Sequence, residues 1–276
     1  MQQNFNPMKL FFSLVFTCII SINLCFSQEQ PFVLGKIEKI KSKQLSETRT
    51  LNIYLPEGYS PDSAKTYPVI YLLDGSANED FIHVTGLVQF LTMIEAMPKS
   101  IVVGIANVDR KRDFTFPTSI EADLKDFPTT GKSASFISFI EKELQPHIQQ
   151  KYKSSGEKTI IGQSLGALLA TEILLKKPSL FTNYLIISPS LWWNNESLLN
   201  DIPKYTENLS KAKANVFIAV GTEGKVMEED AKKLSAVLKP YQNLKVNFAP
   251  LPSENHLTIL HNGLYNGFGL LYPKKK

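Results

Sequence analysis

Ser164 stands in the segment IIGQSLG, which contains the pattern Gly-x-Ser-x-Gly between Gly162 and Gly166. An apolar strand is predicted directly before this pattern and a helix directly after it, a context typical of a nucleophile on a sharp strand-to-helix turn. The two glycines leave room for the turn, and the helix N-terminus favours negative charge beside the serine. Ser164 could instead serve only as the N-cap of the helix. Strand, turn and helix together favour a nucleophilic serine.

A nucleophilic serine needs a base, and on this kind of turn an acid and then the base follow the serine in the chain. The sequence contains four histidines: His83, His147, His256 and His261. The first two precede Ser164 and fall on predicted helices. His256 lies in the loop PLPSENHL between the last predicted strand and the last predicted helix, so we predict that it is the general base. His261 lies one turn into that helix and is expected to pack or to face solvent.

The acid that would orient the base is expected in the segment GTEGKVMEED, which follows a predicted strand at 215–220. Glu223 comes directly after that strand and is the first candidate. Asp230 is a second candidate, although it lies at the start of a helix, where the helix dipole favours acids in any case. A Ser–His pair without a third member is the third candidate arrangement.

An oxyanion hole needs two N–H donors directed at the carbonyl oxygen of a substrate. Leu165, which follows the nucleophile, is expected to supply one of them. The second is expected from Gly75 or Ser76, which follow the apolar stretch YPVIYLL. The same residues could equally form an ordinary turn at the end of a strand.

The elements that position these residues alternate along the chain between short apolar runs and amphipathic stretches. Strands are predicted at 32–40, 50–55, 67–73, 101–106, 158–162, 184–188, 215–220 and 244–249. Helices are predicted at 84–97, 133–151, 164–177, 228–239 and 258–271. The polar stretch 107–130 has no clear periodicity and is predicted to be a long loop. This alternation predicts an α/β fold with a mostly parallel central sheet and helices on both faces.

Composition supports an ordinary globular protein. The chain has 276 residues, of which 43% are hydrophobic and 20% charged, and this excludes disordered, collagen-like and disulfide-scaffold classes. The net charge of +4 is spread along the chain, and the one basic cluster, Lys274–Lys276, is expected to be a solvated tail. No nucleic-acid partner is therefore predicted.

Residues 1–27 have the three parts of a secretory signal. Lys9 is followed by the apolar run Leu10–Phe26, and the small residues Cys25 and Ser27 stand where a signal peptidase would require them for cleavage before Gln28. The same segment could instead be an uncleaved membrane anchor, or a lipoprotein signal with lipidation of Cys25. Each version exports the rest of the chain to the periplasm or the medium, and cleavage would leave no stable membrane span.

The expected mature chain, residues 28–276, is long enough to bury one core and is predicted to be a single domain. Both cysteines of the chain, Cys18 and Cys25, lie in the segment removed. The mature chain therefore has no disulfide, no cysteine nucleophile and no thiolate metal site. No set of histidines and acids has metal-ligand spacing on one helix, so no metal is predicted.

Six stretches resemble the putative-esterase family of α/β-hydrolases, in the branch similar to enterobactin and other trilactone siderophore esterases. They are YPVIYLLDG, IVVGIANVDRKRDFTF, IIGQSLGALLATEILLKKPSLF, ISPSLWWN, FIAVGTEG and ENHLTIL. The resemblance implies an α/β-hydrolase that needs no cofactor and acts on small-molecule carboxylic esters through Ser164 and His256. It also implies that the loop with Arg110 and Arg112 faces the active site, where an arginine would meet an anionic or ferric-catecholate substrate. Feruloyl and acetyl esterases, thioester hydrolases and acyltransferases have similar sites.

Trp192 and Trp193 follow the predicted strand at 184–188, at the sheet edge where open α/β sheets bind ligands. Their faces could stack on a catechol, ferulate or sugar ring, or they could pack in the core. The sequence as a whole predicts an exported serine esterase that forms an acyl-enzyme. Siderophore trilactones are the first substrate class and feruloyl or acetyl esters of polysaccharides the second. The same residues would also suit acyl transfer to an alcohol, and the same fold could serve a non-catalytic ligand-binding protein.

Overall fold

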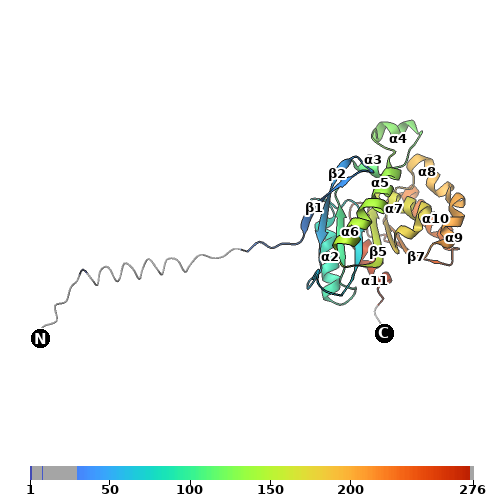
Figure 1. Cartoon of the computed structure of the whole chain (residues 1–276). Coiled ribbons are helices and arrows are strands. Elements are labelled where there is room, and N and C mark those ends of the chain that lie inside the picture. Colours follow the sequence, from blue (N-terminus) through green and yellow to red (C-terminus); the bar gives the residue numbers. More distant parts are fainter. Residues whose placement is uncertain (2–7, 9–29, 274–276) are drawn as a thin grey trace. The chain divides into compact units, whose positions relative to one another are not determined.

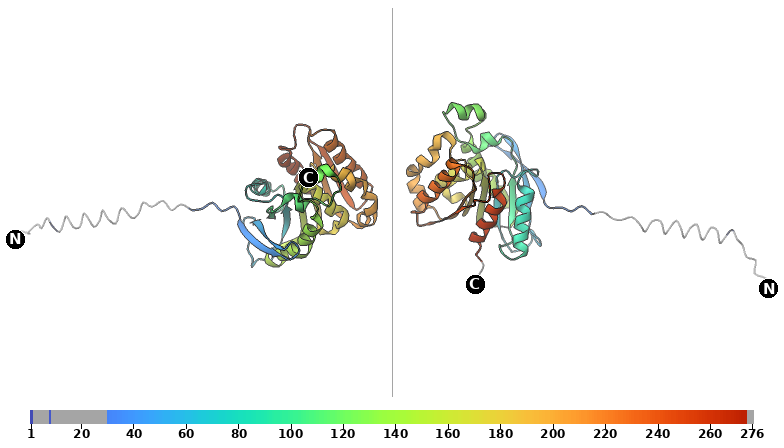
Figure 2. Two further views of the ribbon diagram at one scale, coloured as in Figure 1. Left: turned by 90° about the horizontal axis from the view of Figure 1, so that it is seen from above. Right: turned by 180° about the vertical axis from the view of Figure 1, so that it is seen from behind.

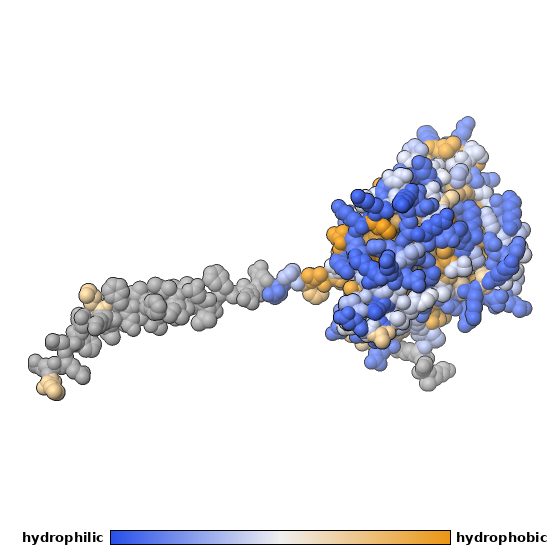
Figure 3. Space-filling model, viewed as in Figure 1, coloured by the Kyte–Doolittle hydropathy of each residue, from blue (hydrophilic) through white to orange (hydrophobic). Residues whose placement is uncertain are grey.

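The computed structural model describes residues 1, 8 and 30–273, and residues 34–273 belong to one compact unit (Figure 1). The predicted signal segment, residues 1–27, lies outside the described residues apart from Met1 and Met8. In the described part of the chain, no helix has both the length and the apolar character needed to cross a membrane. The face of the compact unit seen in Figure 3 is mainly hydrophilic, with scattered hydrophobic side chains.

A central sheet organises the compact unit. Its strands are β1 (Lys36–Ser42), β2 (Glu47–Tyr54), β3 (Tyr67–Leu72), β4 (Ile101–Ile105), β5 (Ser154–Gln163), β6 (Asn183–Ile187), β7 (Ala214–Val220) and β8 (Leu244–Pro250). They lie in the order β1-β2-β4-β3-β5-β6-β7-β8. The first two strands are antiparallel to their neighbours, and all other pairs are parallel. The predicted α/β fold with a mostly parallel sheet is confirmed.

Helices cover both faces of the sheet (Figures 1 and 2). On one face lie α5 (Ser133–Phe139), α6 (Gln145–Lys151), α7 (Leu165–Lys176), α8 (Trp193–Asn200), α9 (Thr206–Lys211) and α10 (Lys225–Leu238). On the other lie α2 (Phe81–Met93) and α11 (Ile259–Leu271). Successive residues of a strand point to opposite faces of the sheet. Tyr71 therefore packs in the core under α5–α10, and Ile70 packs in the core under α2 and α11. Burial on both faces explains why the central strands are continuous apolar runs.

Two regions differ most from the sequence prediction. The stretch predicted as a loop contains the short helices α3 (Arg110–Phe114) and α4 (Glu121–Asp126), and α4 projects from the body in Figure 1. Helices of one or two turns are too short for a hydrophobic period to reveal them. The helix predicted at 133–151 is divided by a π-helical turn, Ile140–Leu144, just before Pro146. Proline has no N–H for the regular helical ladder, which explains the irregular turn.

Three further bounds complete the description. Short 3₁₀ turns lie at Pro178–Leu180 and Ile202–Tyr205. The first strand begins at Lys36, four residues later than predicted. The carboxyl ends of the parallel neighbours β5, β6, β7 and β8 lie side by side. Ser164 follows the end of β5, Glu223 follows β7 and His256 follows β8.

Candidate active site

Ser164 joins β5 to α7 with strained backbone angles, φ 57° and ψ −120°. A non-glycine residue in this region costs about 1–3 kcal/mol and persists only where its surroundings hold it. The Ser164 N–H donates to the carbonyl of Ile187 at 3.1 Å, and its carbonyl accepts from the N–H of Ser190 at 3.2 Å. A Cβ on Gly162 would lie 2.4 Å from the carbonyl of Gly166, so only glycine allows the strand and helix to approach this closely. The structure thus shows the sharp turn that the sequence pattern predicts.

His256 lies in the loop between β8 and α11, with its Nδ1 2.5 Å from Oε2 of Glu223. The carbonyl of His256 accepts a hydrogen bond of 2.5 Å from Nε2 of Gln163, the residue before Ser164. This bond ties the histidine loop to the serine turn. The carboxylate also leaves Nε2 of His256 as the ring nitrogen available to a substrate or to a serine hydroxyl.

The carboxylate of Glu223 is buried, with 2% of its side chain exposed. Its Oε1 accepts hydrogen bonds from Oγ of Ser188 at 2.5 Å and from the N–H of Gly221 at 3.0 Å. Burial by itself would raise the pKa of Glu223, but hydrogen bonds from His256, Ser188 and Gly221 outweigh it and hold the pKa below its ordinary value. Glu223 is therefore an anion beside the imidazole at neutral pH.

Asp230, the other acid considered from the sequence, lies on α10 away from this hydrogen-bond network. Burial, together with the nearby charge of Glu196, raises its pKa to about 6, although Lys233 opposes the shift. The structure therefore pairs Glu223, and not Asp230, with His256.

A pocket of about 510 Å³ brings the predicted residues together. It is lined by Ser164, Ser190, Trp192, Thr222, Glu223, Met227, Asn255, His256 and Leu257. Oγ of Ser164 lies 3.2 Å from Oγ of Ser190. The hydroxyl of Ser164, an imidazole bound to a carboxylate, and an aromatic wall thus share one cavity.

The two neighbouring tryptophans have different surroundings. Trp193 is fully buried, and its indole N–H donates to the carbonyl of Phe116 at 3.0 Å. It belongs to the core, so the expectation that it contacts a substrate is corrected. Trp192 lines the pocket, and its ring centroid lies 6.0 Å from that of Phe127.

Of the predicted oxyanion donors, Leu165 is the first residue of α7, where the backbone N–H has no partner inside the helix. The N–H of Gly75 donates to the carbonyl of Ile105 at 3.0 Å, so the expectation for Gly75 is corrected. The N–H of Ser76 makes a longer contact of 3.3 Å with the carboxylate of Glu79. Both N–H groups thus have partners in this structure, and Ser76, whose contact is longer and made to a side chain, remains the candidate for the second donor.

Arg110 and Arg112 are engaged by carboxylates. Arg110 makes a bidentate pair with Asp74, with hydrogen bonds of 2.6 and 2.9 Å, and also donates to the carbonyl of Gln163, next to Ser164, at 3.3 Å. Arg112 binds Glu47 and Asp113. Neither arginine lines the pocket that holds Ser164. Arg110 borders the serine turn, whereas Arg112 acts in a structural ion-pair cluster.

Two serines at the site were missed by the sequence reasoning. Ser188 holds the carboxylate of Glu223, and Ser190 contacts both the backbone and the hydroxyl of Ser164. Both belong to the stretch ISPS at the end of β6, the strand between β5, which precedes Ser164, and β7, which precedes Glu223. Their position could have identified them, because they are small polar residues directly after a parallel strand, at the sheet edge where ligands bind.

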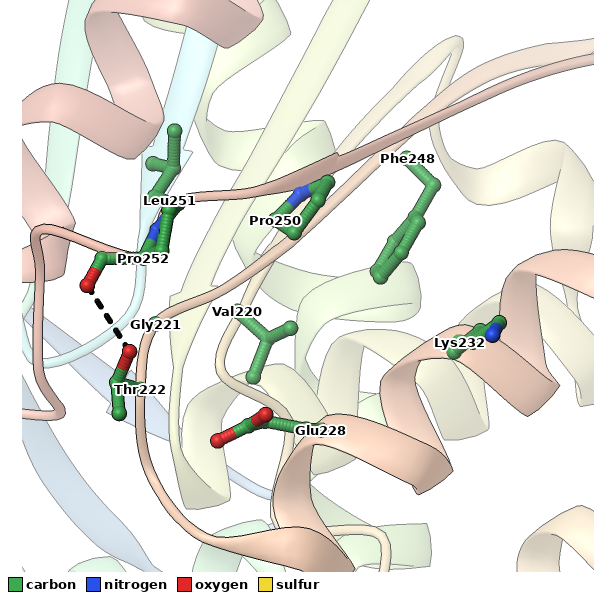
Figure 4. Close-up of a pocket in the computed structure, with 9 residues that line it drawn as sticks. All are labelled: Val220, Gly221, Thr222, Glu228, Lys232, Phe248, Pro250, Leu251 and Pro252. Carbon is green, nitrogen blue, oxygen red and sulfur yellow. Dashed lines mark hydrogen bonds between the residues drawn. The ribbon is translucent and has the colours of Figure 1, made fainter.

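A second cavity of about 320 Å³ lies beside the loop of Glu223 (Figure 4). Phe248, Pro250 and Leu251 form much of its apolar wall, and it shares Thr222 with the first pocket. Glu228, at its border, accepts hydrogen bonds from the N–H groups of Glu223 and Gly224 at 3.0 and 3.1 Å. The contact stabilises the loop that carries Glu223.

Within residues 30–273, no group of three or more histidine, cysteine or acidic side chains could hold a metal ion.

The sheet order, the strained serine turn and the carboxylate-bound histidine after the last strand define an α/β-hydrolase. The chain belongs to the family described as "Putative esterase", whose model matches residues 42–259. Ester hydrolysis is the chemistry of that family.

Relatives with descriptions support this assignment. The chain is similar to the ferri-bacillibactin esterase BesA of Bacillus subtilis, with 31% identity over 241 residues, 78% of this chain and 82% of the relative. Among solved structures it resembles an IroE-like serine hydrolase from Shewanella oneidensis, with TM-score 0.78 and 30% identity over 86% of this chain and 80% of that one. It also resembles the BES protein of Bacillus cereus, with TM-score 0.78 and 30% identity over 90% of this chain and 100% of that one.

Proposed function

We propose that the protein is a serine esterase in which Ser164 is the nucleophile, His256 the general base and Glu223 the orienting acid. One observation carries the proposal: the strained Ser164 and the His256–Glu223 pair line the same pocket. A serine that only capped α7 would not need a carboxylate-bound imidazole in its cavity. A purely ligand-binding protein would have no use for that combination either.

The proposed reaction has two halves. His256 Nε2 takes the proton of Ser164 as its Oγ attacks the ester carbonyl, and the N–H groups of Leu165 and Ser76 stabilise the oxyanion. His256 then returns the proton to the departing alcohol, which leaves an acyl-enzyme. Water, deprotonated by His256, attacks this ester and releases the acid and the free serine. Glu223 holds Nδ1–H of His256 throughout and stabilises the imidazolium.

Siderophore esters are the substrate class that we favour. One relative, which matches 78% of this chain, is named as a ferri-bacillibactin esterase, and a shorter match is the siderophore enterobactin esterase of Emericella nidulans, 37% identical over 78 residues. The exposed part of Trp192 offers a flat wall on which a catechol ring could stack.

We also propose that residues 1–27 direct export, on the strength of the sequence pattern alone. Mass spectrometry of the protein from its native host would find Gln28 as the first residue if this is correct.

Labelling with a fluorophosphonate tests the nucleophile. Intact mass and peptide mapping should find one adduct on Ser164 in the purified protein, and the Ser164→Ala and His256→Ala variants should take up none. A screen with trilactone, feruloyl and acetyl esters then identifies the preferred substrate. Full ester hydrolysis by Ser164→Ala would overturn the proposed mechanism, and feruloyl esters as the best substrates would overturn the substrate class while leaving the mechanism intact.

A further inference from the structure

Arg110 joins the two loops that carry the proposed oxyanion donors. Its Nε and one Nη donate to the two carboxylate oxygens of Asp74 at 2.6 and 2.9 Å. The same Nη also donates to the carbonyl of Gln163 at 3.3 Å. Asp74 begins the loop that leads to Ser76, and Gln163 directly precedes Ser164. One guanidinium therefore holds a side chain of the first loop and the backbone of the second.

The backbone is strained in both of these loops. Asp74 has φ 53° and Ser164 has φ 57°. Non-glycine residues keep such angles only where their surroundings fix them. The carboxylate of Asp74 also accepts from Nδ2 of Asn107 at 2.7 Å, and a Cβ built on Gly166 would lie 3.4 Å from its Oδ2. The ion pair with Arg110 thus holds a strained residue beside the first turn of α7.

The charge of Arg110 is already balanced within the protein. A bidentate pair with a carboxylate uses the planar fork of N–H groups with which an arginine would bind an anionic substrate. Asp74, which is 8% exposed, fills that fork. Arg110 also lies outside the set of residues that line the Ser164 pocket. The structure therefore gives Arg110 protein partners, where the sequence led us to expect an anionic substrate.

The two proposed oxyanion donors must be held at a fixed spacing. Both N–H groups have to point at one oxygen atom, about 2.7–3.1 Å from each. Ser76 and Leu165 follow β3 and β5, which are parallel neighbours in the sheet. Strand pairing positions the start of each loop, and the contacts of Arg110 connect the loops beyond the strand ends. A displacement of about 1 Å at such a site can lower the rate about 10²-fold.

We propose that Arg110 is a positioning residue for the oxyanion hole, an inference that rests on the proposed esterase mechanism. Through Asp74 and the carbonyl of Gln163 it fixes the loop of Ser76 relative to the first turn of α7. The guanidinium touches no reacting atom, so its effect is on the rate of the chemical steps and not on substrate affinity. Because its partners belong to the protein, the effect is the same for neutral and anionic esters.

Kinetics on two matched esters test this role. Phenyl acetate and 4-acetoxybenzoate carry the same acyl group and differ by one carboxylate on the ring of the leaving group. We expect Arg110→Ala to lower kcat about 10- to 100-fold on both esters, with KM within about threefold of the unmodified value. Asp74→Asn should lower kcat to a similar extent. The double variant should lose little more than either single variant, because both substitutions remove one interaction.

Lys125→Ala is the control, since it removes one positive charge from an exposed position on α4. It should leave kcat and KM unchanged on both esters. Thermal midpoints show whether each variant is folded, and Asp74→Asn carries the test if Arg110→Ala is not.

Free guanidinium distinguishes positioning from a general structural role. Arg110→Ala leaves the carboxylate of Asp74 and the carbonyl of Gln163 in place, and 34% of the arginine side chain is exposed, so the ion can enter. Guanidinium chloride, at concentrations too low to unfold the protein, should raise kcat of Arg110→Ala several-fold, whereas sodium chloride should not. Asp74→Asn and Lys125→Ala should show no such rise. Arg110→Lys should recover only part of the activity, because an ammonium cannot present two parallel N–H groups.

Full kcat in the folded Arg110→Ala and Asp74→Asn variants would overturn the proposal. A rise in KM confined to 4-acetoxybenzoate would also overturn it, because Arg110 would then bind the carboxylate of the substrate. A loss of kcat that guanidinium does not restore would leave Arg110 a purely structural residue. Failure of the proposed function looks different: the unmodified protein itself would take up no fluorophosphonate at Ser164, and this inference would fall with it.

Discussion

Glu223 is the residue on which the orientation of His256 depends. Replacing Glu223 with glutamine keeps the size of the side chain but removes its charge and puts an N–H donor where the imidazole N–H now donates. We expect Glu223→Gln to lower kcat roughly 10²- to 10⁴-fold with little change in KM, because the histidine would adopt the wrong tautomer. Steady-state kinetics on an aryl ester measures both constants.

Glu229→Gln is the matched control, since that side chain is 65% exposed and makes a long ion pair with Lys225 at 3.9 Å. It should retain the activity of the unmodified protein. If Glu223→Gln also stayed within a few-fold of that activity, the Ser–His pair would be working without a third member.

Substitutions of the two neighbouring tryptophans distinguish a side chain that stabilises the core from one that contacts the substrate. Trp193→Ala removes a fully buried side chain and should lower the free energy of unfolding by about 3–5 kcal/mol. Trp192→Ala should cost no more than about 2 kcal/mol, since the ring is half-buried, but should raise KM for aryl esters several-fold. Urea unfolding and kinetics on both variants make the comparison. An unchanged KM in Trp192→Ala would remove this ring from substrate binding.

Strand β5 has a glycine near each end, and we expect replacement by alanine to be tolerated at one of them and not at the other. Gly162 meets the backbone of α7, and a Cβ there would lie 2.4 Å from it. Gly156, in the same strand, has nothing within 4 Å of the corresponding position. We expect Gly162→Ala to destabilise the protein by about 2–3 kcal/mol and to displace the serine turn, with loss of fluorophosphonate labelling.

Gly156→Ala should change stability by less than about 1 kcal/mol, in either direction, and leave labelling intact. Equal stability of the two variants would mean that β5 and α7 can separate without cost, which is incompatible with a strained nucleophile held by close packing.

At the scale of the whole molecule, Glu38 joins the edge strand β1 to the segment around α6. It accepts hydrogen bonds from Tyr152, from Lys151 at 2.9 Å and from His147 at 3.2 Å. Burial by itself would raise the pKa of Glu38, but these hydrogen bonds outweigh it and lower the pKa to about 2 from an ordinary value of 4.5. The edge of the sheet thus depends on a carboxylate that stays charged in mild acid.

The sign of the pH effect follows from this pKa. Since the folded-state value lies below the unfolded one, the stabilisation is fully present above pH 4.5 and is lost as pH falls towards about 2. Glu38→Gln should therefore lower the free energy of unfolding at pH 7, and the difference from the unmodified protein should shrink between pH 4.5 and 2.

Urea unfolding at several pH values measures this difference. Glu207→Gln is the control, because Glu207 pairs with Lys211 on an exposed surface and its loss should cost under about 1 kcal/mol. A Glu38→Gln deficit as large at pH 3 as at pH 7 would contradict the prediction.

The sequence by itself determined the fold class and the sharp turn at Ser164, and it singled out His256 as the base that we propose. Continuous apolar strands alternating with amphipathic helices are local patterns, and they allow few arrangements other than a mostly parallel sheet. Gly162, Ser164 and Gly166 form a contiguous pattern whose backbone demands are readable from the chain. His256 could be selected because chain order leaves few histidines after the serine. Short helices such as α4 escaped prediction because they contain too few turns to show a period.

Tertiary structure decided the rest, because it depends on contacts between residues distant in sequence. Only the approach of β7 to the loop after β8 pairs Glu223 with His256 and leaves Asp230 apart. Whether Trp192 or Trp193 faces the pocket depends on how the chain enters α8. The N–H of Gly75 donates to the carbonyl of Ile105 in the neighbouring strand β4. Sequence periodicity describes which face a residue prefers. Which partner occupies that face is a property of the packed molecule.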